Sequence, residues 1–369
     1  MNTRIIFKFL IFLAFSFLVV SCQFVRYVIY NFADVNDHKK FPARTLLHSN
    51  ESFQFARQTS RAEAFVNFGS DSIPLTEYLK KQKTLAFLLI RNDTILIEEY
   101  FNSYAKENIV PSFSMAKSFL SALVGCAIKD GYIKSDEESI TNYLPEMKKN
   151  GFEKVKIFHL LQMTSGLKFN EGYFNPFSQV AGFYYGRKLE KRCTKLKLKA
   201  EPGTAFEYTS GSSQLLGLVL KRALGNISLT EYLQKKIWSP LQMEYDASWN
   251  IDQNKNGTEK AFCCINARAI DYAKFGRLYL KKGNWQGAQI VPEEWVYKST
   301  HPQKLQGSAA YYQYQWWMNS VSDGDFMAEG ILGQYIYVNP KKNIVIVRLG
   351  KKTGDVNWGK FFKKISATL

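Results

Sequence analysis

The chain has 369 residues, of which 46% are hydrophobic, 22% charged and 15% aromatic. This composition excludes a disordered, collagen-like or low-complexity protein, because it provides enough large apolar side chains for a sizeable core. The formal net charge of +17 favours an anionic partner, either a polyanion or a membrane surface. The mean hydropathy of −0.24 excludes a polytopic membrane protein.

The N-terminal segment has the pattern of an export signal. Residues 9–20, FLIFLAFSFLVV, are uncharged and follow two basic residues. This run is shorter than the roughly 20 residues of a membrane-spanning helix and is typical of a signal peptide. The sequence Val19-Val20-Ser21-Cys22 resembles the bacterial lipobox. We therefore expect a signal peptide over 1–21 and lipidation of Cys22, which would make the protein a membrane-anchored lipoprotein of the cell envelope. An uncleaved anchor and an ordinary cleavage site are the alternatives.

The first part of the mature chain lacks a clear period. Residues 22–65 mix charged, Pro, Ser and Asn residues, which predicts a lipid anchor and a loose tether. A folded domain is expected over 66–369. It opens with two runs of β-forming residues, Thr84–Ile90 and Thr94–Phe101, separated by Arg91-Asn92-Asp93. This arrangement predicts an antiparallel hairpin.

The remaining patterns place helices between two groups of strands. Strands are expected at 312–318, 333–338 and 343–349, and helices at 114–130, 156–163, 211–224, 229–237, 266–282, 293–299 and 355–366. This order favours a mixed α/β (α+β) fold, with an antiparallel sheet built from both chain ends, flanked by helices. The sheet part would cover about 66–130 and 265–369. An inserted, mostly helical part would cover about 131–264.

Several common sites are excluded by their missing residues. No GxSxG or HExxH motif is present. The stretch 354–360 resembles a phosphate-binding loop, but Phe361 stands where such a loop has Ser or Thr. We expect no metal and no cofactor. Four further cysteines form no CxxC pair, so at most one disulfide is expected and its pairing stays open: Cys126, Cys193, Cys263 and Cys264. A Ser-His-Asp triad would need His159 or His301, and the helical pattern around His159 is typical of a packed structural residue.

A Ser-x-x-Lys spacing provides a different nucleophile. It places a hydroxyl and an amine on one helix face, where the amine can take the hydroxyl proton. The pattern occurs at Ser103/Lys106, Ser114/Lys117 and Ser165/Lys168, and only Ser114 opens a strongly apolar helix. Burial and the helix dipole would both lower the pKa of Lys117, as a general base requires. The alternative is that Lys117 reaches solvent and Ser114 only caps the helix.

A second motif lies between a turn and a helix. Tyr-x-Ser/Asn occurs five times, and only Tyr208-Thr-Ser210 both follows a Pro-Gly turn and precedes an apolar helix. Such a loop is held rigidly enough to present side chains to a site.

Together these motifs carry a resemblance to a known family. Four stretches in this order resemble those of the penicillin-recognising serine hydrolases, in the branch of the class C β-lactamase-like esterases and 6-aminohexanoate-dimer hydrolases: Ser114-Met-Ala-Lys117, Phe158–Leu167, Glu201-Pro-Gly203 and Tyr208-Thr-Ser210. The resemblance spans about 75–350. It implies that Ser114 is acylated, that Lys117 and Tyr208 share the base role, and that Tyr208 protonates the leaving group. It also implies that Ser210 binds the substrate or Lys117. A cationic neighbour is expected to lower the pKa of Tyr208.

One motif of that family departs here from its usual pattern. Where similar proteins carry a Lys or His, a small residue and Gly, this chain has Ala328-Glu329-Gly330. No cation is present, and Glu329 would repel a substrate carboxylate if it faced the site. This argues against β-lactam hydrolysis. Ester or amide hydrolysis needs only the nucleophile, the base and an oxyanion hole, for which the resemblance implies the backbone N–H groups of Ser114 and Ile331, the latter next to Gly330.

The sequence thus predicts a serine hydrolase that cleaves an ester or amide of a small molecule through an acyl-enzyme on Ser114. A catalytically silent cell-envelope binding protein and a D-Ala-D-Ala peptidase or β-lactamase are the alternatives. Aromatic residues of the loop 168–200 favour an apolar or extended acyl group.

A basic run lies in the same loop. The stretch Arg187–Lys199 carries seven cations and predicts either a solvated face or a site for anionic lipid headgroups. We do not expect nucleic-acid binding, because the chain has no recognisable binding motif and carries an export signal. The oligomeric state is not indicated.

Overall fold

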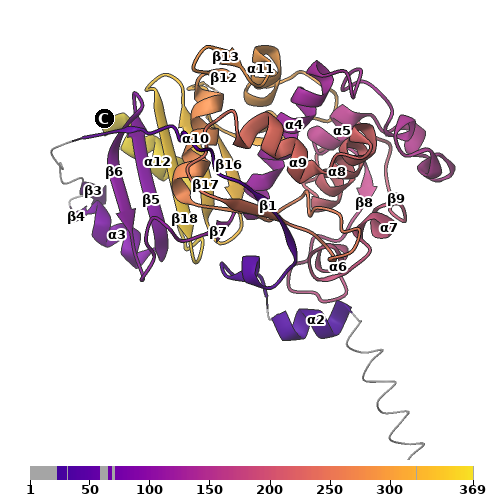
Figure 1. Ribbon diagram of the computed structural model, residues 1–369, viewed down its shortest axis with the longest axis horizontal. Coiled ribbons are helices and arrows are strands. Elements are labelled where there is room, and N and C mark those ends of the chain that lie inside the picture. The colour runs from indigo at the N-terminus through magenta and orange to yellow at the C-terminus, as the bar shows by residue number, and fades with distance from the viewer. Residues whose placement is uncertain (1–22, 31, 59–64, 69–70, 321, 369) are drawn as a thin grey trace, which may run out of the picture.

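The computed structural model describes residues 23–30, 32–58, 65–68, 71–320 and 322–368 (Figure 1). The predicted signal peptide and the predicted lipidation site at Cys22 lie outside the described residues. Within that part of the chain, none of the helices combines the length and the apolar character needed to cross a membrane.

An eight-stranded sheet forms one side of the molecule, in the order β14-β15-β16-β17-β18-β5-β6-β2 (Figure 1). Its strands are β2 (Ala56–Arg57), β5 (Thr84–Arg91), β6 (Thr94–Tyr100), β14 (Tyr312–Gln313), β15 (Trp316–Ser320), β16 (Asp325–Gly330), β17 (Gln334–Asn339) and β18 (Ile344–Gly350). All neighbours are antiparallel except β2 and β6. Because β18 pairs with β5, the two chain ends meet inside one sheet, which confirms the predicted fold.

Helices cover both faces of this sheet (Figure 1). On one face lies α10 (Ala269–Leu280), and on the other lie α3 (Leu75–Lys81) and α12 (Trp358–Thr368). Successive residues of β5 point to opposite clusters, Leu88 to the α10 side and Phe87 to the α12 side. This double burial explains why the strand is a continuous apolar run rather than an alternating one.

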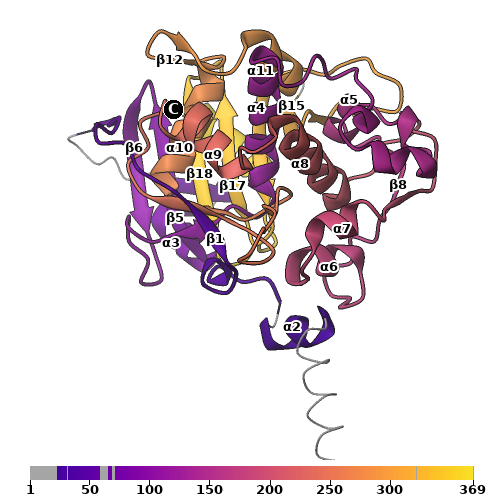
Figure 2. The same ribbon diagram turned by 45° about the vertical axis from the view of Figure 1, so that its right-hand side comes forward.

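The other side of the molecule is mostly helical, with α4 (Ala116–Lys129) and α8 (Ser210–Leu224) at its centre (Figure 2). Around them lie α5 (Ile157–Leu161), α6 (Gln179–Tyr185), α7 (Leu189–Cys193), α9 (Leu229–Leu233), a π-helical turn at Gln234–Trp238 and α11 (Glu293–Thr300). Short 3₁₀ turns occupy Asp37–Lys39, Phe113–Met115, Ile140–Asn142, Pro145–Asn150 and Phe152–Lys154. Minor hairpins pair β3 (Phe65–Phe68) with β4 (Asp71–Pro74), β8 (Leu167–Lys168) with β9 (Lys197–Leu198), and β12 (Asn284–Trp285) with β13 (Ala288–Gln289).

Residues 23–30 and 32–58 pack against the body, where a loose tether was expected. The helix α2 (Gln23–Tyr30) lies beside α6, and β1 (Ala43–Leu46) pairs with β10 (Ala247–Asn250). The small sheet continues through β11 (Ile265–Ala267) to β7 (Val110–Pro111). Leu46 is fully buried and Phe41 nearly so. Apolar burial therefore holds this segment in place.

Candidate active site

The proposed nucleophile lies where a tight turn enters a buried helix. Ser114 occupies the 3₁₀ turn that precedes α4, and the residue before it, Phe113, has a φ of 44°, in the left-handed region that non-glycine residues rarely adopt. The turn is fixed to β11, because the Ser112 N–H donates to Ile265 O at 2.7 Å and the Ile265 N–H donates to Ser112 Oγ at 3.1 Å. This anchoring positions Ser114 at the wall of a pocket.

Lys117 points from the first turn of α4 toward Ser114. Its Nζ donates to Ser114 Oγ at 3.0 Å, to Phe262 O at 2.8 Å and to Ser210 Oγ at 3.4 Å. The side chain is 1% exposed, and burial lowers its pKa to about 8, against the opposing charge of Glu171. The expected buried lysine with a lowered pKa is confirmed, and the alternative of a solvent-exposed Lys117 is wrong.

Tyr208 lies against the same pair. Its ring centroid is 5.1 Å from Lys117 Nζ, and its hydroxyl interacts with that of Ser114. The ring stacks on Trp317 with centroids 5.5 Å apart. The expectation that the neighbouring cation lowers the pKa of Tyr208 is wrong. Burial raises this pKa, the charges of Glu171 and Glu329 raise it further, and the interaction with Ser114 lowers it only in part. Tyr208 is therefore held as a neutral phenol.

A carboxylate that the sequence motifs do not include completes the polar cluster. Glu171 accepts hydrogen bonds from the Ser210 N–H at 2.8 Å, from Ser210 Oγ at 2.5 Å and from the Tyr173 hydroxyl at 2.7 Å. Ser210 is the first residue of α8, so Glu171 also lies at the positive end of that helix. The one available signal was that Glu171 is the single acidic residue in the aromatic stretch 168–186.

The end of β16 runs against the turn that carries the nucleophile. A Cβ atom at Gly330 would lie 2.4 Å from Ser112 O, so only glycine allows this approach. The next residue, Ile331, lines the same pocket as Ser114. The following turn is held by Arg348, whose Nη1 donates to Gly333 O at 2.7 Å. Ile331 therefore lines the pocket together with Ser114, and its role as a second oxyanion donor stays a prediction.

The two residues before Gly330 contribute no cation to the site. Ala328 is fully buried in the core. Glu329 accepts a hydrogen bond from the Tyr335 hydroxyl at 3.3 Å, and burial raises its pKa. Its side chain does not line the pocket, although its charge contributes to the raised pKa of Tyr208.

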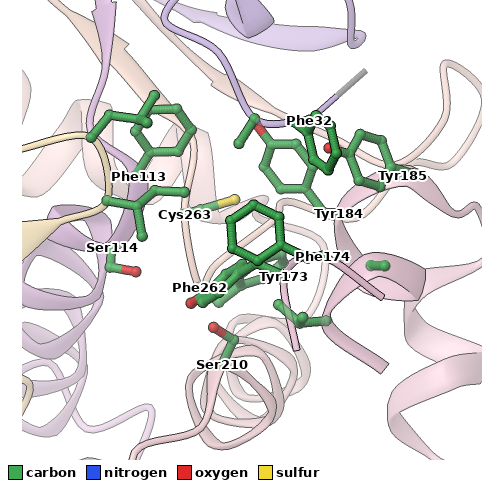
Figure 3. Close-up of a pocket in the computed structure, with 15 residues that line it drawn as sticks. Phe32, Phe113, Ser114, Tyr173, Phe174, Tyr184, Tyr185, Ser210, Phe262 and Cys263 are labelled. Carbon is green, nitrogen blue, oxygen red and sulfur yellow. The ribbon is translucent and has the colours of Figure 1, made fainter. Parts of the chain in front are cut away.

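The pocket beside Ser114 is apolar and about 260 Å³ in volume (Figure 3). Ser114 and Ser210 lie in its wall, and aromatic side chains form much of the remainder: Phe32, Phe113, Tyr173, Phe174, Tyr184, Tyr185 and Phe262. Of the aromatic residues predicted from the loop 168–200, four line the pocket, whereas Phe169, Phe177 and Phe183 do not. The contribution of Phe32 was not expected from the sequence.

The structure also shows where the cysteines and His159 lie. Cys263 and Cys264 form a disulfide between sequence neighbours, and Cys126 and Cys193 are free and buried. His159 is buried, and its Nδ1 accepts a hydrogen bond from the Lys156 N–H at 3.1 Å at the start of α5. This is the structural role expected for that histidine.

A sheet built from both chain ends, a helical region inserted in it and a Ser-Lys-Tyr cluster at their junction together define the class of the serine hydrolases with a β-lactamase fold. The chain belongs to the beta-lactamase family, whose family model matches residues 75–358. It is 28% identical over 301 residues to the 6-aminohexanoate-dimer hydrolase of Paenarthrobacter ureafaciens, covering 74% of each chain.

Solved structures support the same fold. A Bacillus anthracis protein provisionally named a 6-aminohexanoate-dimer hydrolase superposes with a TM-score of 0.80 at 25% identity, covering 93% of this chain and 94% of that one. A penicillin-binding protein from Bacillus halodurans gives 0.63 at 16% identity, covering 80% and 100%. A family VIII carboxylesterase gives 0.58 at 15% identity, covering 75% and 89%.

Proposed function

We propose that this protein cleaves an ester or amide through an acyl-enzyme on Ser114. The proposal depends chiefly on the 3.0 Å hydrogen bond from Lys117 Nζ to Ser114 Oγ beside an apolar pocket. A buried amine with a pKa of about 8 can accept the Ser114 proton near neutral pH.

In the proposed acylation, Ser114 Oγ attacks the carbonyl carbon of the substrate while its proton passes to Lys117 Nζ. The backbone N–H groups of Ser114 and Ile331 stabilise the oxyanion. As the bond to the leaving group breaks, the Tyr208 hydroxyl donates its proton to that group, and Lys117 returns a proton to Tyr208. Water then attacks the acyl-enzyme by the same proton route, which releases the acid and restores Ser114.

The pocket favours an apolar or extended acyl group, because its walls are largely aromatic. Ala328 and Glu329 provide no positive charge for a substrate carboxylate, so we expect esters or amides rather than β-lactams to be cleaved. The Paenarthrobacter relative is named for the 6-aminohexanoate dimer, which makes that compound a suitable test substrate.

Intact-mass spectrometry with a panel of p-nitrophenyl esters, the 6-aminohexanoate dimer and penicillin tests the proposal. We expect an acyl adduct or a nitrophenol burst with the unchanged protein and none with Ser114→Ala. Ser103→Ala is the matched control, since Ser103 belongs to another Ser-x-x-Lys pair and should retain full activity.

Three results would contradict the proposal. An adduct that persists in Ser114→Ala would place the nucleophile elsewhere. The absence of any adduct or turnover would favour the silent binding protein. Release of D-Ala from a D-Ala-D-Ala peptide would favour a peptidase.

We also propose that the protein is exported to the cell envelope and held at the membrane by a lipid on Cys22, on the strength of the apolar run 9–20 and the lipobox-like Val19–Cys22. Metabolic labelling with an alkyne fatty acid should mark the unchanged protein and leave Cys22→Ser unlabelled. Equal labelling of both would exclude Cys22 as the lipidation site.

A further inference from the structure

The mouth of the pocket is marked by side chains that both line it and reach solvent. Phe32 is 46% exposed, Tyr173 38% and Phe174 84%, and all three belong to the pocket wall. In Figure 3, Phe32 lies on the side of the pocket away from Ser114. The pocket therefore opens between the residues after α2 and the loop before α6.

An exposed apolar surface continues outward from this mouth. Val28 and Ile29 of α2 are 58% and 65% exposed. We call the whole surface the apolar rim, and it consists of Val28, Ile29, Phe32, Tyr173, Phe174 and Phe177. Among the described residues, ten large hydrophobic side chains are exposed, and six of them lie in this rim. Such concentration at one place marks an interaction surface rather than scattered surface residues.

Direct contacts join the two parts of the rim. Gln23 Nε2 donates to Pro176 O at 2.6 Å, and the Tyr27 hydroxyl donates to Tyr173 O at 3.4 Å. The rings of Phe32 and Phe174 meet edge to face with centroids 5.7 Å apart. These contacts hold α2 and the residues after it against the loop, so the two parts of the rim lie on neighbouring elements.

A basic groove of about 560 Å³ borders the rim. Four cations line it, and Arg26 stands on α2 itself, two residues before Val28: Arg26, Lys40, Arg187 and Lys255. Of the described lining residues only Asp252 is acidic, and its buried carboxylate accepts hydrogen bonds from the N–H groups of Leu189 and Thr258. The groove therefore presents net positive charge beside the apolar surface.

This combination fits a lipid bilayer with anionic headgroups. The apolar side chains can enter the acyl region while the bordering cations contact headgroup phosphates. A second copy of the chain docking by the same face would bring like charges together, which disfavours self-association there. In the sequence, the apolar run 9–20 ends just before α2 begins at Gln23, so an N-terminal anchor would bring the rim to the same membrane.

We propose that the apolar rim docks on an anionic bilayer and that the pocket takes a long-chain ester directly from it. The identity of the substrate rests on the proposed function, whereas the docking itself does not.

Hydrogen–deuterium exchange on the full chain tests the docking. Vesicles of phosphatidylcholine with phosphatidylglycerol should slow exchange in segments 23–33 and 170–178. Protection at 170–178 requires contact by the rim, because attachment by the N-terminus alone would leave that loop free to exchange. Ile29→Glu and Val28→Glu should abolish the protection, whereas Leu47→Glu, the matched control at 61% exposure, should retain it.

The contribution of the basic groove is tested separately. A chain carrying both Arg187→Glu and Lys255→Glu should lose the extra protection that phosphatidylglycerol gives over phosphatidylcholine alone. Lys342→Glu is the control, since Lys342 is an exposed cation that does not line the groove. It lies in the turn after β17, which ends at Asn339.

A kinetic experiment tests the second part of the proposal, that the pocket takes a long-chain ester from the bilayer. The measured quantity is the rate of hydrolysis of a long-chain p-nitrophenyl ester in vesicles divided by the rate for a soluble acetate ester. We expect Ile29→Glu to lower this ratio by about tenfold. Leu47→Glu should leave the ratio unchanged. An unchanged ratio in Ile29→Glu would overturn the uptake of the ester from the bilayer.

Other outcomes would overturn the docking. Protection that Ile29→Glu retains would exclude the rim, and equal protection by neutral vesicles would exclude the anionic lipid. Protection that appears without vesicles and grows with protein concentration would identify a second copy as the occupant. The exchange experiment can also be run on Ser114→Ala, so the failure of the catalytic proposal would remain distinguishable from the failure of the docking.

Discussion

In the proposed mechanism, the charge state of Lys117 determines when the site can act, because its amine must be neutral to take the Ser114 proton. Burial lowers the pKa of Lys117 from its ordinary value to about 8. With such a pKa, about a tenth of the protein carries the neutral amine at pH 7. The ester kcat/KM should therefore rise with pH, pass its midpoint near pH 8 and level off above about pH 9.

A pH–rate profile with a non-ionising ester measures this midpoint. A profile that keeps rising to the ordinary pKa of lysine would mean that Lys117 is solvated in the working enzyme. A flat profile would remove Lys117 from the proton transfer.

Glu171 should tune the same titration. Its carboxylate raises the pKa of Lys117 by stabilising the ammonium form, in opposition to burial. Replacement by the neutral amide in Glu171→Gln should thus move the midpoint of the kcat/KM profile to lower pH, by up to about one unit. Glu207→Gln is the control, because Glu207 is one residue from Tyr208 but exposed and paired with Lys199. A midpoint that stays in place, or moves upward, in Glu171→Gln would show that this charge does not act on Lys117.

Lys117 and Glu171 also show how much of the site could be predicted from the sequence. Ser114 and Lys117 are three positions apart, one in the turn Phe113–Met115 and the other in the first turn of α4, so their proximity follows from helical spacing. Glu171 reaches Ser210 across 39 positions, over which the chain passes through α6, α7 and β9. Local patterns carry no information about such a contact, which only the folded chain creates.

At the scale of elements, the contact between β16 and the turn at Phe113–Met115 should control the geometry of the oxyanion hole. A Cβ atom in Gly330→Ala would meet Ser112 O at 2.4 Å, so strand and turn would have to separate. This would move the Ile331 N–H away from Ser114. Because misplacement by about 1 Å can cost a hundredfold, kcat should fall by roughly ten- to a hundredfold while KM changes little.

Steady-state kinetics and thermal unfolding of Gly330→Ala test this together. Ile331→Ala is the comparison, since it keeps the backbone N–H and should retain most of kcat for a short ester. If Gly330→Ala folds and turns over at the normal rate, the spacing between β16 and the turn does not matter for catalysis.

The same strand illustrates which elements a sequence can reveal. The β5 and β18 strands are continuous apolar runs bounded by turn residues, and both were predicted within a residue or two. The β16 strand, DFMAEG, contains two acidic residues and a glycine, and its residue pattern did not predict a strand. It is a strand because β15 and β17 pair with it on both sides, so its backbone pairing outweighs its weak propensity.

At the scale of the whole molecule, residues 23–30 and 32–58 pack against the body, and Phe32 lines the pocket beside Ser114. The buried residues of this segment, among them Val35, Phe41 and Phe55, are too widely spaced to form a helical or strand period. Their burial depends on partners far along the chain, such as β10, which pairs with β1 across about two hundred positions. A reading of local periodicity could not detect this.

This arrangement predicts that the N-terminal segment shapes substrate preference. Phe32, from the residues after α2, and Phe174, from the loop before α6, meet at the pocket mouth. Each acyl CH₂ group buried against such a wall contributes about 0.8 kcal/mol, or roughly a fourfold gain in kcat/KM. In a series of p-nitrophenyl esters, kcat/KM should therefore rise with chain length until the pocket is filled. In Phe32→Ala and Phe174→Ala the rise should be shallower, so the ratio of kcat/KM for a long-chain ester to kcat/KM for the acetate ester falls.

Tyr297→Ala, which removes an exposed aromatic outside the pocket, should keep the full slope. Faster reaction of short charged acyl groups, or an unchanged slope in both mouth variants, would show that the acyl chain does not occupy this pocket.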